Sequence, residues 1–146
     1  MSRRALLMLT ALVACGLSAA GCKAKQPSTP EAVAQAFADA MAAGDTEAAA
    51  ELWDFETEAR HSNPDWGEIP SGQRAQIVTK LRSQMAGELK AQMGSFSKGT
   101  KAGTPTLSGT TAAVQLDGGP QGPIAVQLTQ SDGRWRVTTI GPAPGG

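Results

Sequence analysis

The chain has 146 residues, of which 13 are acidic, 13 are basic and two are cysteines. This length suits one domain, and the balanced charge lacks the basic excess of a nucleic-acid-binding protein. Two cysteines are too few for a disulfide-rich scaffold, so a hydrophobic core must stabilise the domain.

The first 21 residues have the pattern of an export signal. Arg3 and Arg4 form a short basic start, the stretch Ala5–Ala20 is apolar or small with few exceptions, and Gly21 precedes Cys22. These are the parts of a secretory signal peptide. The apolar stretch is shorter than the about 20 residues that a membrane-spanning helix needs. We therefore expect residues 1–21 to be a signal peptide that is removed on export.

The segment Leu17-Ser18-Ala19-Ala20-Gly21-Cys22 resembles the lipobox of bacterial lipoproteins, in which small residues precede a cysteine. The chain departs from the usual form because Ala19 stands where the family has a Leu-like residue. The resemblance implies that the Cys22 sulfur receives a diacylglyceryl group and that its freed amine receives a third acyl chain. The protein would then be attached to a membrane through lipid on Cys22.

Cys15 is an alternative lipidation site. The segment Leu12-Val13-Ala14-Cys15 fits the lipobox better by side chain, but it would leave a shorter apolar stretch before the cleavage site. Lys23 follows Cys22 in place of the Asp that retains lipoproteins of Gram-negative bacteria in the inner membrane. The resemblance therefore implies export, with the protein at the periplasmic face of the outer membrane.

The remaining chain divides into a tether over 22–28, one domain over 29–141 and a flexible Pro/Gly-rich tail over 142–146. After processing, Cys22 is the one cysteine left, and lipid occupies its sulfur. We therefore expect no disulfide, no cysteine metal site and no cofactor. The expected partners are the membrane and an envelope protein or small hydrophobic ligand, and not a nucleic acid.

Capping residues and apolar spacing predict three helices. Thr29 and Pro30 suit the start of a helix, Gly44 suits its end, and Asp45 can cap a second helix directly afterwards. Apolar residues then recur at helical spacing. We expect helices over 29–44, 45–58 and 73–93, with a loop over 61–72.

Alternating apolar and polar residues predict an antiparallel sheet in the C-terminal half. Asp132-Gly133 suits a hairpin turn, and we place Trp135, Val137 and Thr139 on one face of the strand that follows it. The expected strands cover 96–101, 111–116, 124–129 and 134–140. The sequence therefore predicts an α+β fold, with three N-terminal helices packed on a curved antiparallel sheet of three to four strands.

Two segments resemble the nuclear transport factor 2-like superfamily of cone-shaped α+β domains. The first is Thr29-Pro30-Glu31-Ala32-Val33 with Phe37 and Ala43-Gly44-Asp45, and the second is the hairpin Ser131–Val137. The resemblance is strongest to small lipoproteins of unassigned function. It implies a homodimer formed through the open sheet face. The superfamily also includes ketosteroid isomerases, scytalone dehydratases and polyketide cyclases, which use Asp or His bases and often Tyr donors inside the cone.

The chain offers few groups for such chemistry, because it has one histidine and no tyrosine. We place His61 in a solvated loop, and with Asp65 alone it does not form a metal site. Three acidic residues could meet near a cone mouth, although acids on alanine-rich helices commonly face solvent: Asp39, Asp54 and Glu58. The candidate lining of an apolar pocket is Trp53, Met85 and Trp135.

We therefore expect a lipid-anchored lipoprotein of the cell envelope whose domain binds a protein or small ligand without catalysis. One alternative is an enzyme of the isomerase or dehydratase type, which requires a closed apolar cavity holding a buried carboxylate. Another is a structural lipoprotein of an envelope assembly.

Overall fold

The computed structural model describes residues 25–144, so Cys15 and Cys22 lie outside the described residues. Four α-helices precede the sheet within this range: α1 (Pro30–Ala43), α2 (Thr46–Glu51), α3 (Phe55–Ser62) and α4 (Ser71–Gln92), which continues into a 3-10 turn, η1 (Met93–Ser95). None of these described helices is long and apolar enough to cross a membrane.

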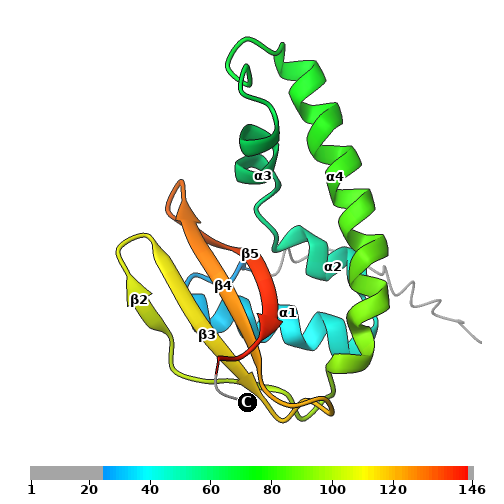
Figure 1. Cartoon of the computed structure of the whole chain (residues 1–146), viewed down its shortest axis with the longest axis vertical. Helices are drawn as coiled ribbons and strands as arrows, with labels where there is room; N and C mark the ends of the chain where they lie inside the picture. Colours follow the sequence, from blue (N-terminus) through cyan, green and yellow to red (C-terminus); the bar gives the residue numbers. More distant parts are fainter. Residues whose placement is uncertain (1–24, 145–146) are drawn as a thin grey trace, which may run out of the picture.

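Five antiparallel strands follow: β1 (Lys101–Ala102), β2 (Thr106–Ser108), β3 (Thr111–Asp117), β4 (Ile124–Ser131) and β5 (Arg134–Pro142). The order across the sheet is β1-β3-β4-β5, and β2 pairs with another part of β3. Figure 1 shows α1 lying across one face of the sheet, while α3 and the first half of α4 run side by side beyond the sheet. We call this projection, with the loop 63–70 between its helices, the helical arm.

The termini of the first helix are those expected from the sequence. The Thr29 hydroxyl accepts a hydrogen bond from the Ala32 N–H at 3.2 Å, and Pro30 is the first helical residue. Gly44 ends α1 with a φ of 77°, in the left-handed region that glycine adopts without strain. Asp45 then caps α2 through the Ala48 N–H. The predicted tight connection between the first two helices is therefore confirmed.

The core lies between α1 and one face of the sheet. Phe37 is fully buried at its centre, with its ring centroid 6.2 Å from that of Trp53 and 5.9 Å from that of Phe96. The buried sheet residues are those that alternation predicted: Val114, Leu116, Val126, Leu128 and Val137, with Ile124 and Trp135 partly buried beside them. The α+β class is confirmed, and the predicted sheet faces are confirmed in β3, in β4 and in β5 as far as Val137.

The predicted second helix over 45–58 is wrong, because the chain leaves the helical conformation at Leu52–Asp54. There it runs beside β5: the Val137 N–H donates to the Leu52 carbonyl oxygen at 2.8 Å, and the Asp54 N–H donates to the Val137 carbonyl oxygen at 2.8 Å. These bonds to a distant strand replace two helical ones. A new helix, α3, starts at Phe55 and includes His61, which the sequence placed in a loop.

The predicted strand over 96–101 is also wrong, since only Lys101 of that range belongs to a strand. In β5 the predicted alternation holds only as far as Val137. Leu128 faces Val137 and Gln127 faces Thr139, so Thr138 is an additional residue on the β5 side of the ladder. This bulge turns Ile140, rather than Thr139, toward the face that carries Val137.

Candidate functional site

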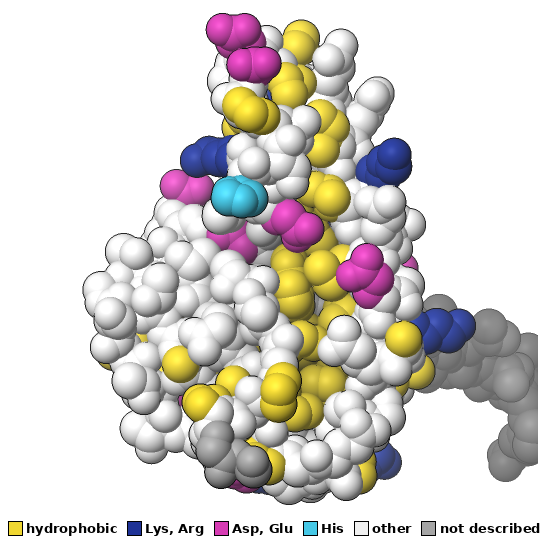
Figure 2. Space-filling model, in the orientation of Figure 1, with side chains coloured by type: hydrophobic (Ala, Val, Ile, Leu, Met, Phe, Trp, Pro, Cys, Tyr) yellow, Lys and Arg dark blue, Asp and Glu magenta, His cyan; other side chains and the backbone are white. Residues whose placement is uncertain are grey.

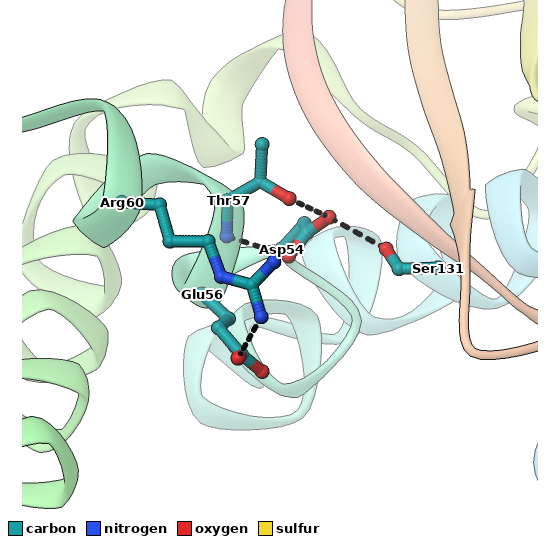
Figure 3. A network of polar contacts seen from close by, with 5 residues as sticks. All are labelled: Asp54, Glu56, Thr57, Arg60 and Ser131. Carbon is teal, nitrogen blue, oxygen red and sulfur yellow. Dashed lines mark hydrogen bonds and ion pairs between the residues drawn. The ribbon is translucent and has the colours of Figure 1, made fainter. Parts of the chain in front are cut away.

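The junction between the helical arm and the sheet is organised by Asp54. This residue is 3% exposed. Its Oδ1 accepts a hydrogen bond from the Thr57 N–H at 3.1 Å and so caps α3. Its Oδ2 accepts hydrogen bonds from the Thr57 hydroxyl at 2.7 Å and from the Ser131 hydroxyl, at the end of β4, at 3.0 Å (Figure 3). One buried carboxylate therefore holds the start of α3 against the β4–β5 hairpin.

An exposed ion pair lies beside this junction. Arg60 Nη2 is 2.6 Å from Glu56 Oε1, and the two residues are one helical turn apart on α3 (Figure 3). Exposed pairs of this kind contribute little to stability. The pair nevertheless occupies the Arg60 side chain, while the Arg82 guanidinium lies 6.0 Å from the centre of the Phe55 ring.

An open groove of about 310 Å³ lies between the helical arm and β5. Trp53 and Met85 supply its apolar surface, whereas Glu58, His61 and Thr138 are polar. The remaining lining residues are Asp54 and Thr57. We call this hollow the arm groove. In Figure 2, a strip of hydrophobic side chains follows α4 past the sheet, with the histidine and several acidic side chains beside it.

The arm groove has an apolar floor because of the local sequence on two elements. On α4, Val78, Leu81 and Met85 are three or four residues apart, so they fall on one helical face and are partly buried against the core. Of the three, Met85 lines the arm groove. On the other side, the bridge to Val137 fixes Trp53, which is 7% exposed. A rigid aromatic ring and a flexible thioether thus line the same hollow, a combination suited to apolar ligands.

The structure brings together only part of the predicted pocket lining. Trp53 and Met85 share the arm groove, as predicted. Trp135 instead lines a separate hollow of about 240 Å³ between the β4–β5 hairpin and residues 25–28. The predicted grouping of three side chains is therefore wrong for Trp135, because this residue lies at the hairpin end of β5, outside the arm groove.

The three candidate acids do not form a catalytic cluster. Asp54 is bonded within the junction, and Glu58 is exposed at the rim of the arm groove. Asp39 lies on α1, where its Oδ1 accepts a hydrogen bond from the Gln35 side chain at 2.8 Å. The same Gln35 side chain accepts from the Ala102 N–H, so Asp39 belongs to the end of the fold near β1.

His61 and Glu58 are three residues apart on α3, and both line the arm groove. Helical spacing places such residues on one face. The structure therefore places His61 on the same groove as Glu58, whereas the sequence assigned His61 to a separate loop. Among residues 25–144, no group of three or more His, Cys, Asp or Glu side chains could hold a metal ion.

Sequence reasoning missed the partners of Asp54 and the role of Thr138 in the lining. The signal for the cap was present, since Asp54-Phe55-Glu56-Thr57 places an Asp before a helix with acids in its first turn. Continuous apolar spacing from the preceding helix obscured it. The contact with Ser131 spans 77 residues along the chain and has no local signal.

A comparison with solved structures found a protein from Campylobacter jejuni that is provisionally named an NTF2-like transpeptidase. The two chains are 20% identical with a TM-score of 0.47, and the match covers 77% of this chain and 99% of that one. A similarity of this size is no evidence that this chain has the activity of that protein. No protein-family model and no curated protein matches the sequence.

Proposed function

We propose that the chain is a lipoprotein attached through acyl chains on Cys22 to the periplasmic face of the outer membrane. Its nuclear transport factor 2-like domain binds a protein segment or small hydrophobic ligand in the arm groove, without catalysis. The observation that carries the binding role is the groove itself, in which Trp53 and Met85 present apolar surface between two firmly packed elements.

Lipid on Cys22 is sufficient for the anchor. Each buried methylene group contributes about 0.8 kcal/mol to membrane binding, and one myristoyl chain attaches a protein only reversibly. Two or three chains therefore hold the domain at the membrane, and its surface remains available for a ligand. The support for the anchor is the lipobox-like segment that ends at Cys22.

The packing of the domain favours binding over catalysis. The interior between α1 and the sheet contains the Phe37 ring packed against both Trp53 and Phe96, at the position where a cone enzyme would keep its substrate cavity. The deeply buried carboxylate, Asp54, accepts hydrogen bonds with both oxygens. Its role in the junction leaves it poorly placed to take a proton from a substrate.

The second candidate function is an enzyme of the isomerase or dehydratase type. The specific observation in its favour is that His61 and Glu58 lie on the rim of the same apolar groove. A histidine at the rim of an apolar groove has the chemistry of a general base. This function predicts turnover that His61→Ala abolishes while ligand affinity is retained.

Binding to the arm groove can be tested with the neutral fluorescent probe N-phenyl-1-naphthylamine. Met85→Glu places a charge on the apolar floor and should weaken probe binding by about tenfold or more. Leu107→Glu is the matched control, because Leu107 is 61% exposed on β2, away from the groove. If both variants bind the probe as the unmodified protein does, the arm groove is not the binding site.

A further inference from the structure

The residues nearest to the proposed anchor pack against the β4–β5 hairpin. Lys25–Ser28 and Gly133–Arg136 line opposite sides of one hollow, and Leu52 contributes to its lining. Arg134 Nη1 donates to Gln26 Oε1 at 3.4 Å. We call the two segments together the hairpin surface. Figure 1 shows the first described residues passing beside β5.

The chain length between Cys22 and this surface is short. Lys25 is three residues after Cys22, and an extended chain spans at most about 3.6 Å per residue, so Lys25 lies within about 11 Å of the lipid-bearing residue. The headgroup layer of each leaflet is about 5–8 Å thick. Because residues 25–28 lie against the hairpin, the hairpin must also lie close to the lipid headgroups.

The side chains of the hairpin surface suit that position. Lys25 and Arg134 are exposed, and Arg136 is partly exposed. The nearby acids are Glu51, which lines the same hollow, and Asp132 in the hairpin turn. Trp135, next to Arg134 in the sequence, is partly buried against the core and lines the same hollow, and tryptophan is the residue most typical of the boundary between headgroups and hydrocarbon.

We infer that the hairpin surface rests on the membrane and binds the phosphate groups of anionic lipids, with Lys25 and Arg134 as the contacting cations and Trp135 at the headgroup boundary. This inference rests on the proposed lipid anchor at Cys22. It fixes the orientation of the domain, which the anchor alone does not. It also accounts for the packing of residues 25–28 on the hairpin, since a tether folded onto the domain keeps that face near the bilayer.

The test uses the full-length lipidated protein inserted in vesicles that carry a headgroup-labelled quencher of tryptophan fluorescence. One set contains phosphatidylcholine alone, and the other contains about one third phosphatidylglycerol. Trp53 and Trp66 are each 7% exposed, so Trp135→Phe identifies the signal from Trp135. The charge variant is Arg134→Glu. Its matched control is Lys101→Glu. Lys101 lies opposite Asp117 in the register of β1 and β3, at the end of the sheet away from the hairpin.

The inference predicts about twofold stronger quenching on the anionic vesicles, a loss of that gain in Arg134→Glu, and no change in Lys101→Glu. Equal quenching on both vesicles, or equal effects of the two charge variants, overturns it. Mass spectrometry of the same preparation separates the two proposals: lipid on Cys22 without headgroup contact refutes the orientation alone. A mature chain that begins at Cys15 refutes both, because the added length allows a reach of about 36 Å.

Discussion

Removing the Asp54 carboxylate tests whether this side chain holds the helical arm to the sheet. Asp54→Ala deletes three hydrogen bonds, one from the Thr57 backbone and two from the hydroxyls of Thr57 and Ser131. A helix cap contributes about 1 kcal/mol, and a hydrogen bond to a charged group about 1.5–3 kcal/mol. Part of this sum is offset because the variant no longer buries a charge. We expect Asp54→Ala to lower the free energy of unfolding by about 2–4 kcal/mol.

The matched control is Asp45→Ala. Asp45 caps α2 through a single hydrogen bond, from the Ala48 N–H at 3.0 Å, and it lies in an exposed position. This substitution should cost only about 1 kcal/mol. Urea unfolding followed by tryptophan fluorescence measures both losses, provided that the slope of the transition stays unchanged. If Asp54→Ala costs no more than Asp45→Ala, the buried network does not stabilise the junction.

A double-mutant cycle isolates the long-range part of this interaction. Ser131→Ala removes only the hydroxyl that reaches Asp54 from β4. If that contact stabilises the protein, the loss of unfolding free energy in the double variant should differ from the sum of the Asp54→Ala and Ser131→Ala losses by at least about 0.5 kcal/mol. Additive losses would show that the cap on α3 accounts for the whole effect of Asp54.

The remaining predictions concern close backbone approach and the core, and urea unfolding measures them all. Gly119→Ala should cost about 1–3 kcal/mol, because its Cβ would lie 2.6 Å from the Ser95 carbonyl oxygen. Gly87→Ala, at a position on α4 with open space for a Cβ, should stabilise the protein by up to about 1 kcal/mol. If Gly119→Ala and Gly87→Ala changed the free energy of unfolding equally, both predictions would be wrong. Phe37→Ala should cost about 3–5 kcal/mol, whereas Leu107→Ala should change stability by less than about 0.5 kcal/mol. Similar losses would refute the assigned core.

Local signals predicted much of the fold. The caps at Thr29 and Gly44 act within one helical turn, so the sequence specified both ends of α1. The apolar spacing of α4 predicted its extent to within two residues at the start. The turn at Asp132-Gly133 was also readable, since both residues have positive φ values, of 51° and 72°. Each of these features depends on neighbours along the chain.

The candidate site was less predictable because distant parts of the chain form it. Leu52–Asp54 leaves the helix to bond with Val137, and Ser131 reaches the Asp54 carboxylate. The two short strands β1 and β2 exist only through pairing with β3. The bulge at Thr138 reversed the expected faces at the end of β5. Periodicity contains no information about such pairings.

Mass spectrometry of the mature N-terminus shows whether the protein is processed and lipidated at Cys22. The protein would be expressed with its own signal sequence in a Gram-negative host and extracted from membranes with detergent. We expect a chain that begins at Cys22 and carries the added mass of a diacylglyceryl group and an amide-linked acyl chain. A chain that begins elsewhere, or an unmodified Cys22, would contradict it.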